Sequence, residues 1–126
     1  MATLTTTLIQ SITPTSTGSN GLTITFPFVS DKAKGCGYSG NTNGMHTVEY
    51  STANNCVLIL KMQGSLSTDP TNDDWVDITN SVYGNGISPV PNQALLLNFT
   101  GNFVWVRAVV LSLTAGSINR VQYTHN

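Results

Sequence analysis

Residues 103–123 read Phe103-Val-Trp-Val-Arg-Ala-Val-Val-Leu-Ser-Leu113, then Thr114-Ala-Gly-Ser117, then Ile118-Asn-Arg-Val-Gln-Tyr123. The first run is long and rich in β-branched and aromatic residues, and the last is shorter and alternating. Two such runs joined by a few turn residues predict a β-hairpin. Because the first run is apolar on both faces, it is typical of a central strand, with Trp105 as an anchor of the core.

Further strand patterns precede this hairpin along the chain. Alternating or apolar runs predict strands at the segments that follow: 3–12, 22–26, 46–51, 57–66, 75–78, 82–87 and 94–99. Gly- and Pro-rich turns separate them, and no stretch has helical periodicity. The pattern predicts an all-β fold over residues 1–126: one antiparallel β-sandwich domain, jelly-roll-like, with about eight strands.

Composition limits the partners of the domain. Charged residues make up 9% of the 126 residues and the formal net charge is −1, while Ser, Thr and Asn account for about a third. There is no basic field that would hold nucleic acid, and no apolar run long enough to cross a membrane. Low charge leaves little repulsion between molecules, so part of the surface is expected to form stable contacts, which favours an assembly component over a dilute cytosolic enzyme. The first twelve residues lack the pattern of an export signal, so we expect none.

Metal and cofactor sites have weak sequence support. Cys36, His46, Cys56 and His125 lack zinc-ligand spacing, and we expect the two cysteines to be unpaired, partly buried thiols. The acidic cluster Asp69, Asp73, Asp74 and Asp77 lacks the Gly and Glu of an EF-hand loop and is read as a solvated turn. Gly35–Gly40 matches G-x-G-x-x-G, but no helix follows it. We therefore predict no metal, no cofactor and no catalytic residue.

Contact residues are predicted in loops and at strand ends. Residues 31–44 hold four glycines and two asparagines and are expected to form a long surface loop with Tyr38 at its centre. Trp75 and Tyr83 are the other candidate contact residues. Arg107, inside an apolar strand, is the most unusual charge. We expect it either to pair with a buried carboxylate, Asp77 being the first choice, or to lie in an oligomer interface.

Several strand segments together resemble a known class of protein. They are Leu60-Lys-Met-Gln-Gly-Ser-Leu66, Asp74-Trp-Val-Asp-Ile78, Phe99-Thr-Gly-Asn-Phe-Val-Trp-Val-Arg-Ala-Val109 and Ile118-Asn-Arg-Val-Gln-Tyr123, with residues 35–50 also similar. Their order resembles small structural proteins in the virions of tailed bacteriophages, above all those of cyanobacterial and marine phages. The resemblance covers most of residues 24–124.

This resemblance implies a non-enzymatic virion component that is assembled in the host cytoplasm and acts as a homo-oligomer. The first expectation is a decoration or cement protein, which binds the major capsid protein through β-edges and loops. A component of the neck, tail or fibres is the next expectation. A glycan- or receptor-binding β-sandwich module is the alternative from another class, with Tyr38, Trp75 or Tyr83 as stacking platforms.

Overall fold

Antiparallel β-strands make up the fold, as the sequence predicts. The computed structural model describes residues 5–15, 24–40 and 44–125, and no α-helix occurs among them. The elements in chain order are β1 (Thr6–Ile9), β2 (Phe28–Val29), β3 (Ala33–Lys34), η1 (Cys36–Ser39), β4 (Met45–Ser65), η2 (Asn72–Asp74), β5 (Val76–Asp77), β6 (Ala94–Thr100) and β7 (Trp105–His125), where η marks a 3₁₀ turn.

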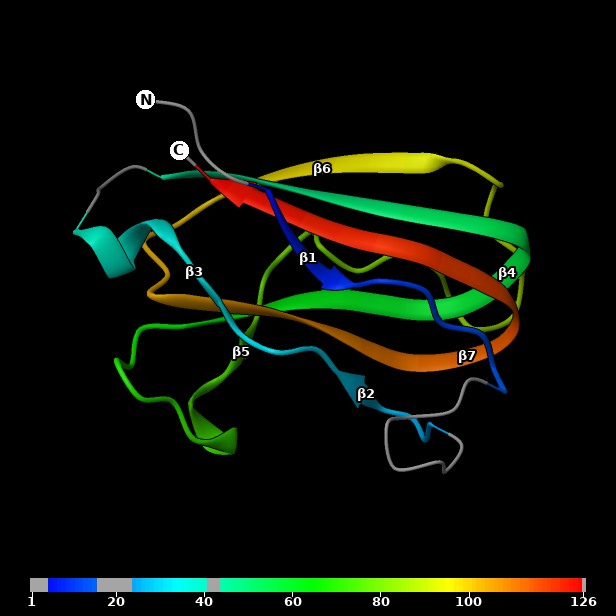
Figure 1. Ribbon diagram of the computed structural model, residues 1–126, viewed down its shortest axis with the longest axis horizontal. Coiled ribbons are helices and arrows are strands. Elements are labelled where there is room, and N and C mark those ends of the chain that lie inside the picture. Colours follow the sequence, from blue (N-terminus) through cyan, green and yellow to red (C-terminus); the bar gives the residue numbers. More distant parts are fainter. Residues whose placement is uncertain (1–4, 16–23, 41–43, 126) are drawn as a thin grey trace.

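Two very long strands, β4 and β7, form the frame of the molecule. They pair antiparallel along their whole length, from His46 opposite His125 to Ser65 opposite Trp105. Midway, the register of the ribbon shifts between Ala53 and Val57, and both strands turn sharply. Figure 1 shows the green β4 and the orange-to-red β7 bending together at one end of the molecule. The ribbon therefore folds back on itself and places its two halves face to face.

The predicted hairpin within residues 103–123 is wrong. Residues 114–117 do not reverse the chain between paired neighbours; they lie at the bend inside the single strand β7. Likewise, Asn54 and Asn55, with φ of 62° and 57°, bend β4 where the sequence predicts a turn between two strands. In both places the strand on each side of the bend pairs with the other long strand.

Each half of the ribbon carries its own edge strands. The first layer consists of residues 45–53 of β4 and 117–125 of β7, with β6 along β4 and β1 along β7. The second layer consists of residues 57–65 and 105–115, with β5 along β4 and both β2 and β3 along β7. The sandwich-like arrangement is thus one sheet folded over, and its strand order does not confirm a jelly-roll-like connection.

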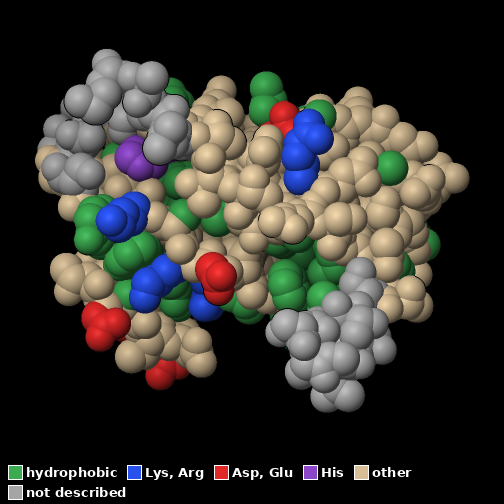
Figure 2. All heavy atoms as spheres, viewed as in Figure 1, with side chains coloured by type: hydrophobic (Ala, Val, Ile, Leu, Met, Phe, Trp, Pro, Cys, Tyr) green, Lys and Arg blue, Asp and Glu red, His purple; other side chains and the backbone are tan. Residues whose placement is uncertain are grey.

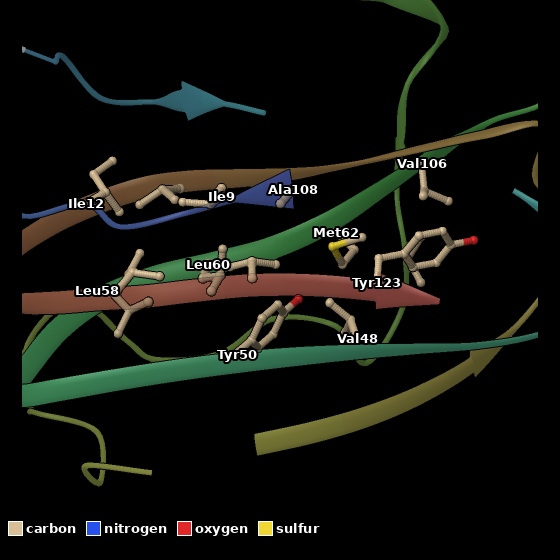
Figure 3. Close-up of a cluster of buried hydrophobic side chains, with 14 of the residues drawn as sticks. Ile9, Ile12, Val48, Tyr50, Leu58, Leu60, Met62, Val106, Ala108 and Tyr123 are labelled. Atoms are coloured by element: carbon tan, nitrogen blue, oxygen red, sulfur yellow. The ribbon is translucent and has the colours of Figure 1, made fainter. Parts of the chain in front are cut away.

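The core fills the space between the layers. Alternate residues of each strand face inward, so that Val48 and Tyr50 of the first layer meet Leu58, Leu60 and Met62 of the second. Figure 3 shows these side chains converging between the ribbons. The Tyr50 hydroxyl crosses the core and donates a hydrogen bond to the Ser81 carbonyl oxygen, at 2.9 Å. Burial of these apolar side chains between the two layers makes the main favourable contribution to the stability of the fold.

Three local predictions need correction. The predicted strand 22–26 lies partly outside the described residues, and Ile24–Phe26 form no strand; Ile24 and Phe26 pack on the core without a pairing partner. Within the predicted loop 31–44, β3 and η1 are ordered elements. The predicted strand 82–87 is reduced to one bridge between Tyr83 and Leu60. The described residues contain seven strands, where the sequence predicts about eight. Two pairs of predicted strands are merged in β4 and β7, two predicted strands are lost, and β2 and β3 are additional.

Candidate functional site

The outer side of the second layer carries a cluster of aromatic rings and cations, which we call the charged aromatic face: Lys32, Lys34, Tyr38, Trp75, Trp105 and Arg107. Tyr38 and Trp105 meet edge to face, with ring centroids 5.1 Å apart. Lys34 Nζ lies 4.5 Å from the Tyr38 ring centroid and Lys32 Nζ lies 4.8 Å from that of Trp105. Figure 2 shows most of the Lys and Arg side chains gathered over one part of the surface, beside hydrophobic ones.

Arg107 is held on this face, but not as predicted. Its guanidinium carbon lies 4.3 Å from the Trp75 ring centroid, and its Nε donates a 2.9 Å hydrogen bond to Gln63 Oε1. The expected pair with Asp77 is wrong, because Asp77 forms its salt bridge with Lys61 at 2.8 Å. The hydrogen bonds from Lys61 and Gln63 lower the pKa of Asp77. Gln63 thus links Arg107 to the Lys61–Asp77 salt bridge through its side-chain amide.

Trp105 is not a core anchor. Its side chain is half-buried on the outer side of β7, and it lies outside the buried cluster. Its indole Nε1 donates a hydrogen bond to the Thr68 carbonyl oxygen at 3.1 Å. The core position next to it is taken by Val106, which is fully buried. Trp105 therefore lies on the outer face of β7, whereas the sequence predicts that it faces the core.

The three predicted contact residues do not form one platform. Tyr38 is 47% exposed, and Trp75 is half-buried beneath Arg107, both on the charged aromatic face. Tyr83 instead packs against the core and stacks on Tyr50, with ring centroids 5.9 Å apart. The structure therefore brings Tyr38 and Trp75 to one side of the molecule and keeps Tyr83 from joining them.

A buried Cys–His pair lies where η1, β4 and the turn after β6 meet. His46 Nε2 lies 2.8 Å from the Gly101 carbonyl oxygen, and Cys36 Sγ lies 3.0 Å from the same oxygen and 3.4 Å from Nε2. The Tyr123 hydroxyl lies 2.5 Å from His46 Nδ1. Because a carbonyl only accepts, the network assigns the proton to Nε2 and makes Nδ1 the acceptor from Tyr123.

The hydrogen-bond arrangement of this network does not suit a Cys–His nucleophile. Burial lowers the pKa of His46, so the ring is neutral at physiological pH. Burial also raises the pKa of Tyr123, whose hydroxyl keeps its proton. A Cys–His nucleophile needs the imidazole nitrogen that faces the thiol to accept its proton. Here that nitrogen and the Cys36 thiol both donate to Gly101, so the pair acts as a structural clasp.

The candidate metal ligands do not gather at one site, although Cys36 and His125 both lie near His46. His125 lies near His46, with ring centroids 6.1 Å apart, whereas Cys56 is at the ribbon bend. Asp74 accepts from the Thr71 backbone N–H and Asp77 pairs with Lys61. Across residues 5–15, 24–40 and 44–125, no three His, Cys, Asp or Glu side chains gather in a way that could hold a metal ion. Both cysteines are free and buried, which confirms the prediction of unpaired thiols.

Two adjoining hollows at the open end of the sandwich form what we call the end groove. They measure about 530 and 670 Å³ and share Val76 and Phe103 in their walls. Leu66 and Val76 are 71% and 67% exposed beside Phe103, and Met45 is also exposed. The alternation of residues 57–66 predicts that Leu66 faces the same way as Leu58, Leu60 and Met62, which are buried in the core. It lies at the surface instead, because β4 ends at Ser65.

Comparison of the chain with protein-family models, with curated proteins and with solved structures finds no match. None of the helices in the described part of the chain has the length and apolar character to cross a membrane.

Proposed function

We propose that the protein is a non-enzymatic structural component of a bacteriophage particle. The preferred role is a capsid decoration or cement protein, which is assembled in the host cytoplasm and binds the major capsid protein. A role in the neck, tail or fibres comes next. The sequence segments that resemble phage virion proteins support this proposal, and they correspond to the ends of β4 and β7, to β5 and to the loop before β7.

The observation that carries the proposal is the end groove. Leu66 and Val76 present large apolar side chains to solvent at the rim of a hollow whose wall is Phe103. Removing apolar surface from water is favourable by about 25 cal/mol per Å², before the costs of association are subtracted. A chain with only 9% charged residues has little surface charge to oppose such contact. The groove therefore suits an apolar segment of a large protein partner.

The test measures binding of the purified protein to capsids that lack it. Saturable binding is expected, and Val76→Asp should weaken it at least tenfold, because the carboxylate would be desolvated in the interface. Ile87→Asp is the matched control, since Ile87 is 83% exposed and lies outside both hollows. Absence of binding, or equal binding by both variants, would refute the proposed site; absence of the chain from purified particles would refute the function.

Glycan or receptor binding is the second candidate, and the charged aromatic face is the observation that favours it. Tyr38 is exposed there beside Lys34, and aromatic rings with neighbouring polar groups can stack on sugars. However, Lys34 and Arg107 already cover ring faces of Tyr38 and Trp75, which leaves less open ring for a ligand. Binding to a glycan array that is lost in Tyr38→Ala, without binding to capsids, would select this candidate.

A further inference from the structure

The free edge of β6 is a regular strand edge with nothing paired to it in the described chain. β6 spans Ala94–Thr100 and pairs with β4 on one side only. Figure 1 shows it as the outermost strand along one rim of the molecule. Its sequence, Ala-Leu-Leu-Leu-Asn-Phe-Thr, contains no charge, proline or glycine. Natural edge strands usually carry charged residues or proline, because an unprotected edge pairs with other strands.

The other edges of the sheet are irregular. β1 has four residues and a register shift between Thr7 and Ile9. β2 and β3 have two residues each, and β5 also has two. After β5, residues 78–91 run beside β4 and are joined to it only by isolated hydrogen bonds. Gly84 and Gly86 in this segment have positive φ, and two prolines interrupt its end. Among the described residues, β6 alone offers a long, straight edge.

The hydrogen-bond pattern identifies which backbone groups are free. The Thr52 N–H donates to Gln93 O, and the Gly101 N–H donates to Gly44 O. Since antiparallel bonding alternates along a strand, Leu95, Leu97 and Phe99 direct their N–H and C=O groups at β4. The outward groups belong to the residues between them: Ala94, Leu96, Asn98 and Thr100.

We propose that two copies of the protein pair through β6, antiparallel and about a two-fold axis at Leu97. In this register Leu96 lies opposite Asn98 of the second copy, and Ala94 lies opposite Thr100. Every outward N–H and C=O of β6 then has a partner, as buried backbone groups require. A shift of the axis to Leu95 or Phe99 would leave the groups at one end of each strand unpaired.

A second copy fits this edge better than a charged partner does. β6 carries no charged side chain, so no like charges would lie opposite each other when the β6 strands of two copies pair. Leu96 is 63% exposed on the outer face, and pairing would cover part of its side chain with residues of the second β6. Leu95, Leu97 and Phe99 face the core side, so the two first layers would continue as one sheet across the axis. Such an isologous contact closes as a dimer.

Two measurements test the pairing. Sedimentation velocity over a range of concentrations should show a dimer, and Leu96→Lys should raise its dissociation constant roughly tenfold or more. Lysine is tolerated in the fold at this site, because Glu49 lies opposite Leu96 on β4. Leu66→Lys is the matched control, with an exposed Leu outside β6, and should leave the dimer intact. A monomer at all concentrations, or equal weakening by both variants, would overturn the proposal.

Cysteine cross-linking tests the register separately. Leu97→Cys places two thiols in a non-hydrogen-bonded pair across the axis, where Cα atoms lie about 4.5 Å apart, within disulfide reach. Leu95→Cys is its control, because Leu95 would face Phe99 of the other copy. Mild oxidation should link the first variant and not the second, while linkage of Leu95→Cys alone would exclude this register. The pairing is independent of the proposed function: Leu66→Lys should lose capsid binding and keep the dimer.

Discussion

Gly116 of β7 lies directly against Cys56 of β4 at the bend of the long ribbon. A Cβ atom added to Gly116 would lie 2.5 Å from Cys56 Cα and 2.8 Å from the Ala53 carbonyl oxygen. The φ angle of Gly116 is also positive, at 75°. Glycine is needed here both for its backbone conformation and for the close approach of β4. This contact allows the ribbon to fold over and close the core.

We therefore expect Gly116→Ala to lower the free energy of unfolding by roughly 3 kcal/mol or more, because it adds a backbone clash to the strain of positive φ. Gly40→Ala is the control: its φ is 78°, and no described atom lies within 4 Å of the added Cβ. That variant should lose only about 1 kcal/mol. Urea denaturation midpoints measure both. Equal losses would mean that the contact with Cys56 is unimportant for stability.

The individual strands were predictable because their faces alternate. Leu95, Leu97 and Phe99 face inward on β6 as the pattern indicates. The bend was not predictable from local signals. Asn54-Asn55 and Gly116 are residue types that adopt positive φ readily, and they do so in a hairpin turn and in a strand bend alike. The choice between them depends on pairing between residues far apart in the chain, such as Val57 and Ala115.

The buried clasp had no sequence signal either. Cys36, His46, Gly101 and Tyr123 come from four separate parts of the chain, and no spacing connects them. Its main acceptor is a backbone carbonyl, which any residue could provide. The charged aromatic face was predictable only in part. The sequence marks Arg107 as a charge within an apolar strand, but its hydrogen-bond partner is the neutral Gln63 and not Asp77.

His46 should make stability depend on pH. Burial holds its pKa in the folded protein below the ordinary value of 6.5. As the pH falls below 6.5, the unfolded chain therefore takes up a proton at this ring before the folded chain does. This contribution to stability is complete above pH 6.5 and is lost as the pH falls from there towards the folded pKa. The free energy of unfolding should thus decrease between pH 7.5 and pH 5, as measured by urea denaturation.

His46→Gln separates this effect from other titrating groups. The variant should be less stable at pH 7.5, since it disturbs the bonds to Gly101 and Tyr123. Its loss between pH 7.5 and pH 5 should nevertheless be smaller than that of the unaltered protein. Asp77, whose pKa is lowered, is already ionised throughout this range and does not contribute. An identical pH dependence in both proteins would exclude His46 as the cause.

Cys56 should be an unreactive thiol in the folded protein. It is fully buried at the ribbon bend, and burial raises its pKa to about 11. At pH 8 only on the order of 0.1% of such a group is thiolate, compared with a sizeable fraction of an ordinary cysteine. In a Cys36→Ala variant, reaction with an aromatic disulfide reagent at pH 8 should be slow. It should become fast in denaturing urea, and fast reaction of the native variant would contradict the burial of Cys56.

Arg107 should stabilise the second layer through Trp75 and Gln63 and not through an ion pair. Arg107→Ala should lower the free energy of unfolding by about 1–2 kcal/mol, because it removes a cation–π contact and a hydrogen bond on a half-buried surface. Arg107→Lys should recover only part of this loss, since an ammonium lacks the planar stacking surface of a guanidinium. Urea denaturation at pH 7 measures both variants.

Arg120→Ala provides the matched control for this prediction. Arg120 pairs with Glu49 at 2.8 Å, but its side chain is 47% exposed and solvent screens the pair. Its loss should cost about 0.5 kcal/mol or less. Raising the salt concentration should reduce the effect of Arg120→Ala and leave that of Arg107→Ala nearly unchanged, because a contact with an aromatic face and a neutral amide is screened less than a surface ion pair. If added salt reduced both effects equally, Arg107 would be acting as a surface charge, and its contacts with Trp75 and Gln63 would not explain its place in the strand.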